Sequence, residues 1–276
     1  MKVGYLGPES SFTHQAARKQ FSTNLFAYAS IPACLKALLK DEVDLAIVPI
    51  ENSLEGSVHH TIDLLSHEPE LQVKNEVVLP IKQQFLIHPF LDGKEIKKIL
   101  SHPQALAQSQ LFLEENYPEV ELVPMPSTTA AAEYVANHPK ESVAAIASEE
   151  TAAYFNLKIL YGNIQDNDLN QTRFWLLGKP TTHFLEETPS KMSLVLTLPA
   201  NQPGMLHKML AAFGWREINL SKIESRPLKT SLGEYFFVID LLLDRPYELI
   251  DNAITEIELL GGKVQNLGGY PVKCFD

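Results

Sequence analysis

Several polar clusters in this sequence stand where apolar, strand-like runs end, and their side chains could hold an organic anion. The first such run ends at Gly7-Pro8, and Ser10 and Ser11 follow directly before a helix-like segment. Ser127 and Thr128 open another helix in the same way. Free N–H groups at a helix start, together with hydroxyl groups, favour a carboxylate or a phosphate. Ordinary capping of the helices explains the same residues without a ligand.

A second apolar run, Ile47–Ile50, is followed by Glu51 and Asn52. Ligands of open α/β sheets bind beyond the carboxyl ends of the strands, so both side chains are candidates for hydrogen bonds to a substrate. Gly56 would let the backbone approach that substrate closely. A turn that uses Asn52 and Gly56 only for its geometry is the alternative.

A third cluster places Ser101 at a strand end and His102 just before Pro103, at a helix start. Gln104 and Gln108 are four residues apart and therefore share one face of that helix. His102 could act as a general acid or base. A histidine beside a proline is more often structural, and that reading is the stronger one.

The fourth cluster is a polar loop, Asp166–Asn170, that leads into Thr172, Arg173 and Phe174. Residues 1–189 contain 24 acidic and 14 basic side chains, and only two of the latter are arginines, Arg18 and Arg173. The planar guanidinium fork fits a carboxylate, so Arg173 is a candidate to hold one. An internal ion pair with one of the many acids is the alternative.

Composition limits the classes of function. The chain has 276 residues, enough for two domains, and a net charge of −11, which argues against nucleic acid or an anionic membrane as a partner. No apolar run approaches the ~20 residues of a membrane helix. Cys34 and Cys274 cannot form a disulfide framework, and no spacing typical of metal ligands occurs, so we expect no metal and no cofactor. The N-terminus lacks the apolar stretch of a signal peptide, which predicts a cytoplasmic protein.

Up to about residue 180, short β-rich runs alternate with amphipathic segments, which predicts an α/β fold with mostly parallel sheets. The expected strands are Lys2–Leu6, Asn24–Ala29, Leu45–Ile50, Gln84–His88, Lys97–Ser101, Glu121–Pro124, Ser142–Ala147 and Thr172–Leu177. The expected helices are Phe12–Gln20, Ile31–Leu39, Val58–Leu65, Pro103–Glu115 and Thr128–Asn137.

A polar, proline-bearing linker near residues 180–189 separates a second unit. Its expected order is strand, helix, strand, strand, helix, strand, which is the ferredoxin-like βαββαβ order. A Pro-Gly step at its first strand–helix junction exposes helix N–H groups to a carboxylate, and a nearby acid could take an ammonium group. These residues suit an amino acid, although ordinary loops explain them equally well: Gly204, Met205, Leu206, Asn219, Leu220, Glu224 and Ser225.

Together the motifs resemble those of the prephenate dehydratases, in the monofunctional form with a C-terminal ACT domain, across essentially the whole chain. The matching segments are Gly7-Pro8, Ser11–His14, Pro49–Ser53, Ser101–Ala105, Ser127-Thr128, Thr172–Phe174, Gly204–Leu206 and Glu224–Pro227. The resemblance implies a two-lobed catalytic domain, similar to periplasmic binding proteins, over residues 1–180, with an inserted lobe at about 80–155. An ACT domain would occupy residues 190–276.

The resemblance also implies the reaction, which is the decarboxylative dehydration of prephenate to phenylpyruvate in L-phenylalanine biosynthesis. Formation of an aromatic ring drives this reaction, so neither a metal nor a strong base is needed. Thr172 would be the most critical residue, with Glu51, Asn52, Ser101 and Gln108 in the same cleft. Glu51, if burial protonated it, would be the second candidate for proton donor. The expected substrate-binding residues are Arg173, Phe174, Ser11, Ser127, Thr128 and Gln104.

Regulation and assembly follow from the same resemblance. L-Phenylalanine would bind the ACT domain as an allosteric ligand, and the protein would form a homodimer or a homotetramer. Ser10 and Met205 depart from residues frequent in the family, and the Asp166–Asn170 loop lacks a proline frequent near Asp168. Two other functions stay open, an arogenate dehydratase and a non-catalytic small-molecule binding protein, and turnover of each compound would separate them.

Overall fold

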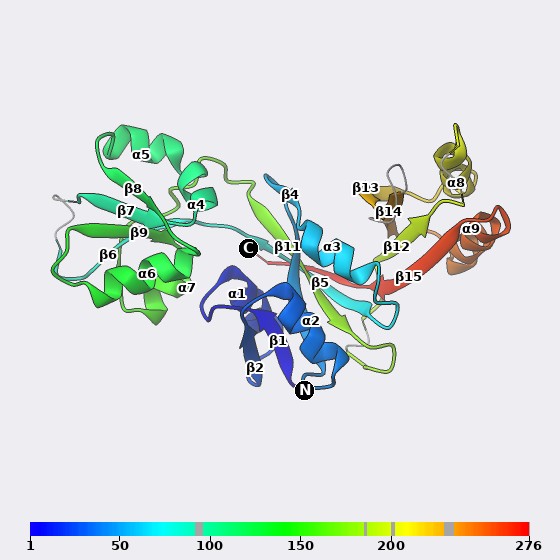
Figure 1. Ribbon diagram of the computed structural model, residues 1–276, viewed down its shortest axis with the longest axis horizontal. Helices are drawn as coiled ribbons and strands as arrows, with labels where there is room; N and C mark the ends of the chain where they lie inside the picture. The colour runs from blue at the N-terminus through cyan, green and yellow to red at the C-terminus, as the bar shows by residue number, and fades with distance from the viewer. Residues whose placement is uncertain (92–95, 185–186, 200–201, 229–234, 276) are drawn as a thin grey trace.

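The computed structural model describes residues 1–91, 96–184, 187–199, 202–228 and 235–275, and it contains three β-sheets (Figure 1). The five-stranded sheet lies at one end of the elongated molecule and the four-stranded sheet at the other, with the seven-stranded sheet between them. The chain therefore has a mixed α/β fold, as the alternation of apolar runs predicted.

The seven-stranded sheet is central and has the order β16-β5-β11-β3-β1-β2, with β4 paired to β3. Neighbours β1, β2 and β3 are parallel, whereas β11 runs antiparallel to both β3 and β5. Helices α2 and α3 pack on one face and α1 on the other. The elements are β1 (Val3–Leu6), α1 (Phe12–Gln20), β2 (Leu25–Tyr28), α2 (Ile31–Leu39), β3 (Leu45–Asn52), β4 (Gly56–Ser57), α3 (His59–Leu65), β5 (Gln72–Pro80), β11 (Gln171–Gly178) and β16 (Val272–Cys274).

The five-stranded sheet has the order β10-β6-β9-β7-β8 and is inserted between β5 and β11. It extends to Tyr161, further than the expected limit near residue 155. The elements are β6 (Gln84–Ile87), β7 (Lys98–Ser101), α4 (Pro103–Ala107), α5 (Gln110–Asn116), β8 (Glu121–Pro124), α6 (Thr128–Asn137), β9 (Val143–Ala147), α7 (Glu149–Tyr154) and β10 (Lys158–Tyr161). Helices α6 and α7 cover one face, and α4 and α5 the other.

One predicted helix, Pro103–Glu115, is in fact two. Gln108 ends α4, and its carbonyl oxygen accepts a hydrogen bond from the backbone N–H of Asp166 at 2.7 Å. That carbonyl therefore serves the loop before β11 and does not continue the helix. The break fixes Gln108 beside the segment that carries Thr172.

The four-stranded sheet has the order β13-β14-β12-β15, and all its neighbours are antiparallel. Helices α8 and α9 pack on one face of it. The elements are β12 (Lys191–Thr197), α8 (Met205–Gly214), β13 (Leu220–Pro227), β14 (Tyr235–Leu242), α9 (Tyr247–Leu259) and β15 (Lys263–Tyr270). This is the predicted βαββαβ order, and we call residues 190–270 the C-terminal domain.

Residues 190–276 were all expected to form one C-terminal unit, and that expectation is wrong for the last strand. β16 pairs with β5 in parallel, so the chain returns to the central sheet. β5 itself was overlooked, because Asn75 and Glu76 interrupt its apolar alternation. Both are buried, since β5 is covered on both faces.

A buried cluster of charges joins the C-terminal domain to the central sheet. The Nη2 atom of Arg173 on β11 donates to Glu76 Oε2 at 2.6 Å and to Asp240 Oδ2 at 2.7 Å. The side chains of Glu76 and Asp240 are each only 1% exposed. Lys191 of β12 also donates to Glu76, at 2.8 Å. The cluster therefore links strands that belong to two sheets.

A second row of polar contacts extends the same interface. Lys222 of β13 donates to Glu51 Oε1 at 2.8 Å, and Glu224 accepts a short hydrogen bond from Ser57. Arg226 binds Asp63 of α3 through two nitrogens, each at 3.1 Å. Since side chains alternate along a strand, Lys222, Glu224 and Arg226 all face the central sheet.

We expect Asp240→Ala to lower the free energy of unfolding by about 3 kcal/mol, because removal of one partner leaves the buried Arg173 charge incompletely compensated. Denaturant unfolding followed by tryptophan fluorescence measures this, since Trp175 also donates to Glu76, at 2.9 Å. Asp244→Ala, at an exposed position, is the matched control. Equal losses in the two variants would contradict the assigned importance of the cluster.

Acidification tests the same cluster. Burial alone would raise the pKa of Glu76, but the charges and hydrogen bonds of Arg173 and Lys191 outweigh burial and lower the pKa below its ordinary 4.5. The folded protein therefore binds this proton less readily than the unfolded chain, and the resulting stability is present above pH 4.5 and is lost as the pH falls through the lowered pKa. Glu76→Gln should be less stable at neutral pH and should lose less stability on acidification. Parallel melting-temperature profiles of the two proteins would refute this.

Candidate active site

A cleft of about 350 Å³ lies between the central sheet and the five-stranded sheet. Strand ends and turns line one wall, and the starts of α4 and α6 line the other. The part of the molecule built on the central sheet (the central part) contributes Phe12, Pro49, Asn52, Glu55, Gly56, Ser57, Val58, Ile81, Gln83 and Thr172. The part built on the five-stranded sheet (the five-stranded part) contributes His102, Gln104, Ala105, Gln108, Pro126, Ser127 and Thr128. Six of these residues were predicted from the sequence to belong to a site: Asn52, Gln104, Gln108, Ser127, Thr128 and Thr172.

Thr172 and Asn52 face each other across the ladder between β11 and β3. The amide nitrogen of Asn52 donates to Thr172 Oγ1 at 2.9 Å. The hydroxyl oxygen of Thr172 is thus already an acceptor, so its proton is free to donate to another atom. The cleft is where such an atom can lie.

A second amide pair crosses from the central part to the five-stranded part. The side chain of Asn170 accepts from Asn52 Nδ2 at 2.8 Å and donates to Gln108 Oε1 at 2.9 Å. Asn170 was not predicted as a site residue. Its position two residues before Thr172, at the end of a polar loop, was the only available signal.

The start of α6 supplies donors to the opposite wall of the cleft. Ser127 caps this helix by accepting from the N–H of Ala130 at 3.0 Å, and Thr128 is its first residue. His102 caps α4 through its Nδ1 atom, at 3.3 Å from the N–H of Gln104. His102 therefore has the structural role that was favoured from the sequence, although it also lines the cleft.

Two predicted cleft residues lie on the other face of the central sheet. Arg173 is next to Thr172 and therefore points away from the cleft, into the buried charge cluster. Glu51 pairs with Arg173 at 2.5 Å and does not line the cleft. The expectation that Arg173 holds a substrate carboxylate is corrected accordingly, and the alternative of an internal ion pair is what the structure shows.

The expected protonation of Glu51 is wrong as well. Burial alone would raise its pKa, but the hydrogen bonds and charges of Lys222 and Arg173 lower the pKa below its ordinary value. Glu51 is thus an ionised partner of two cations and no proton donor at neutral pH. Of the two candidate donors, Thr172 is the one that lines the cleft.

Three further predicted residues serve packing or capping. Phe174 is 1% exposed and packs in the core beneath α1. Ser101 is fully buried, and its hydroxyl donates to the Ile146 carbonyl at 2.6 Å, which ties β7 to β9. Ser11 caps α1 by accepting from the N–H of His14 at 3.3 Å. None of the three lines the cleft.

The residues predicted to bind an amino acid are divided by the fold. Gly204 stands before α8 with φ +79°, followed by Met205 and Leu206, while Asn219 and Leu220 are at the start of β13. Ser225 is exposed, but Glu224 points to the central sheet, where Ser57, Lys222 and His59 surround its carboxylate. The prediction that Glu224 takes a ligand ammonium is therefore not supported by its contacts.

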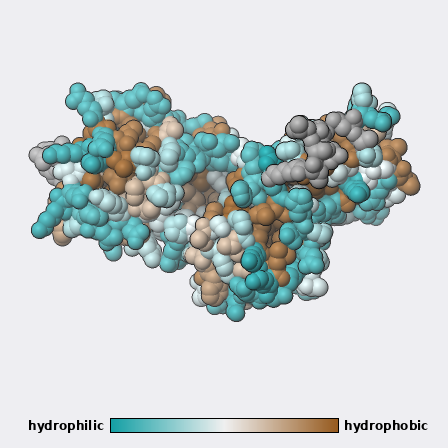
Figure 2. All heavy atoms as spheres, viewed as in Figure 1, coloured by the Kyte–Doolittle hydropathy of each residue, from teal (hydrophilic) through white to brown (hydrophobic). Residues whose placement is uncertain are grey.

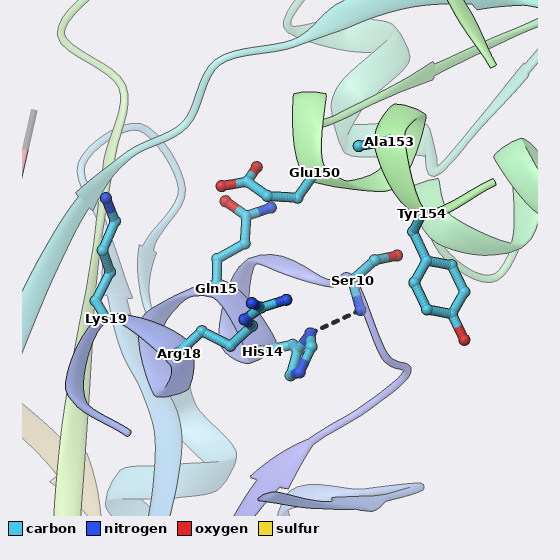
Figure 3. Close-up of a pocket in the computed structure, with 8 residues that line it drawn as sticks. All are labelled: Ser10, His14, Gln15, Arg18, Lys19, Glu150, Ala153 and Tyr154. Carbon is cyan, nitrogen blue, oxygen red and sulfur yellow. Dashed lines mark hydrogen bonds between the residues drawn. The ribbon is translucent and has the colours of Figure 1, made fainter. Parts of the chain in front are cut away.

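A second cavity, of about 490 Å³, lies between α1 and α7 (Figure 3). Gln15, Arg18 and Lys19 project from α1 on one side, with Glu150 of α7 opposite. Gln15 donates to Ser148 at 2.7 Å and Thr151 donates to the Ser10 carbonyl at 3.0 Å, so this region joins the two parts of the molecule. Burial lowers the pKa of His14, whose Nδ1 accepts from the N–H of Ser10 at 3.0 Å.

Within the described ranges, no group of three or more His, Cys, Asp or Glu side chains is arranged to hold a metal ion. Across the same residues, none of the helices is both long enough and apolar enough to cross a bilayer.

Comparisons with known proteins identify the family. The family model of prephenate dehydratase matches residues 3–182. A prephenate dehydratase of Lactococcus lactis subsp. lactis is 48% identical, over 99% of this chain and 98% of that protein, and one of Bacillus subtilis is 46% identical, over 98% of both. The crystal structure of a prephenate dehydratase from Arthrobacter aurescens in complex with L-Phe is 32% identical, covers 98% of this chain and 90% of its own, and has a TM-score of 0.89. The chain therefore belongs to the prephenate dehydratase family of lyases.

Proposed function

We propose that the cleft catalyses the decarboxylative dehydration of prephenate to phenylpyruvate, for L-phenylalanine biosynthesis, with Thr172 as the hydrogen-bond donor to the departing hydroxyl. The observation that carries this proposal is the contact from Asn52 Nδ2 to Thr172 Oγ1 at 2.9 Å. This contact occupies an acceptor site of the hydroxyl and leaves its proton to a ligand in the cleft.

The chemistry requires little of the protein beyond placement and hydrogen bonding. The bond between the ring and its carboxylate breaks, carbon dioxide leaves, and the electron pair enters the ring as the C–O bond to the hydroxyl breaks. The departing hydroxide takes a proton and becomes water, and the ring becomes aromatic. A positioned donor to the leaving oxygen contributes about 10²–10⁴ in rate.

The two substrate carboxylates would be held by neutral dipoles, because Arg173 is engaged elsewhere. Suitable donors are the N–H groups at the start of α6, after Ser127 and Thr128, and the side-chain amides of Gln104 and Gln108. All four residues line the cleft. Donors that are fixed before the substrate arrives need no reorganisation during the reaction.

Thr172→Ala should lower kcat by about 10² or more and change KM little, because the hydroxyl acts mainly on the leaving group. Thr172→Ser should retain more activity. Thr255→Ala, on the exposed side of α9, is the control. Phenylpyruvate release from prephenate, and phenylalanine release from arogenate, are measured in parallel. A near-normal kcat in Thr172→Ala would refute the role of Thr172 as donor. Turnover of arogenate but not of prephenate would identify arogenate as the substrate.

We also propose that the C-terminal domain is an ACT domain that binds L-phenylalanine between two copies of the chain. Support comes from the βαββαβ topology and from the Arthrobacter aurescens relative in complex with L-Phe. Ser225 is the sixth residue of β13 and Asn219 directly precedes that strand, so the two are roughly 20 Å apart at about 3.3 Å per residue. One chain cannot bring both to the same small ligand, so a second copy must supply one of them.

The surface of this domain supports self-association. β13 is an edge strand of its sheet, and Ile223 and Ser225 on it are exposed. Figure 2 shows hydrophobic surface at the outer end of the domain, over α9, which ends at Leu259 with 83% exposure. A homodimer, or a homotetramer built from it, would cover such surface.

Phenylalanine should inhibit the full-length protein, and Asn219→Ala and Ser225→Ala should each raise its half-inhibitory concentration about tenfold, through loss of a hydrogen bond to a charged group. Ser221→Ala, an exposed position on the same strand, is the control. Prephenate should weaken phenylalanine binding by the factor with which phenylalanine weakens prephenate binding, as calorimetry can measure. Unchanged inhibition in the Asn219→Ala/Ser225→Ala double variant would indicate that the regulatory site lies outside this domain.

A further inference from the structure

Asn170 is a buried amide with no role in the reaction as proposed so far. It is 1% exposed and lies in the loop between β10 and β11, outside the cleft lining. Its backbone carbonyl accepts from the N–H of Ile81 at 2.8 Å, which anchors the loop to the central part. Both ends of its side chain make hydrogen bonds, one to each part of the molecule.

The orientation of the Asn170 side-chain amide is set by a series of hydrogen bonds that begins at Asn52. The backbone N–H groups of Leu54 and Glu55 point to Asn52 Oδ1, at 3.0 and 3.1 Å. Only an oxygen can accept from them, so the NH₂ group of Asn52 must face the other way. There it donates to Thr172 Oγ1 and Asn170 Oδ1, with a third, longer contact of 3.2 Å to the Gln171 carbonyl.

The same reasoning continues through Asn170 to Gln108. Because Asn170 Oδ1 is occupied by a donor, its NH₂ group is the end that meets Gln108, and the Gln108 oxygen must accept, at 2.9 Å. The NH₂ group of Gln108 therefore takes no part in the contact with Asn170. This nitrogen is buried and has no hydrogen-bond partner among the described residues, and Gln108 lines the cleft.

We infer that Asn170 is a positioning residue that holds the Gln108 amide with its NH₂ group toward the ligand. The inference rests on the proposed function, and it identifies the ligand group as an oxygen acceptor, such as a carboxylate or keto oxygen of the substrate. A buried donor without a partner is costly, and a ligand oxygen would satisfy it. Without the donor that Asn170 supplies, Gln108 can turn and present its oxygen to an anionic ligand.

The test reverses the series of hydrogen bonds. Asn170→Asp places only acceptors at this position, so Asn52 can still donate to it, while Gln108 must turn its NH₂ group toward the new carboxylate and its oxygen toward the cleft. KM for prephenate should rise about tenfold or more while kcat changes much less, since the loss concerns binding. Asn170→Ala should raise KM by a smaller factor, because it frees the Gln108 amide without reversing it.

Two controls separate this effect from charge and from folding. Asn167→Asp adds the same charge in the same loop, at an exposed position, and keeps its acceptor for the N–H of Leu169, so KM should stay near the normal value. In a Gln108→Ala background, Asn170→Asp should add little to KM, since the group through which it acts is gone. Melting temperatures of all variants report folding.

The outcomes distinguish the two proposals. If the unaltered protein does not consume prephenate, the proposed function fails. If it does, and Asn170→Asp raises KM equally with and without Gln108, or no more than Asn167→Asp does, the positioning role is overturned while the function stands. A larger KM for Asn170→Ala than for Asn170→Asp also overturns it.

Discussion

The ladder between β3 and β11 brings two neighbouring residue pairs to opposite faces of one sheet. Asn52 and Thr172 face the cleft, and the adjoining pair, Glu51 and Arg173, faces the C-terminal domain. The alternation of side chains along a strand makes this division unavoidable. The C-terminal domain consequently holds, through Asp240 and Lys222, residues that are covalent neighbours of the two cleft residues. Under the proposed regulation, one peptide bond separates each residue that the C-terminal domain holds from a cleft residue.

Under the proposed function, the cleft recognises an anion without Arg173, because this interface occupies the guanidinium. With the arginine committed to three carboxylates, the cleft relies on side-chain amides, hydroxyls and the start of α6. Neutral donors of fixed orientation attract an anion less strongly at long range than a cation would, but they discriminate by geometry. The orientation of these donors is then what the protein has to control, and in our proposal the hydrogen-bonded amides of Asn52 and Asn170 control it without charge.

Much of the fold was predictable because its signals are local. Ser11 and Ser127 cap α1 and α6, whose bounds match the expected ranges. Asn52 and Thr172 adjoin recognisable strand ends, and Gln108 shares a helix face with Gln104. Glu51 and Arg173 were misplaced because their partners are distant in sequence: Lys222 binds Glu51, and Glu76 and Asp240 bind Arg173. β5 was missed for a related reason. A buried strand can contain Glu76 only because Arg173 and Lys191 bind its carboxylate. Residues whose roles depend on such long-range partners lie beyond local reasoning.

The return of β16 to the central sheet has a consequence for biosynthesis on the ribosome. Domains generally fold in the order in which they are synthesised. Here the neighbour of β5 on one side is Val272–Cys274, which emerges only after the whole C-terminal domain has been translated. Until then β5 presents an open edge, a feature that invites pairing with other chains. The central sheet is therefore completed only by the last residues to be made, although its other strands lie before residue 179.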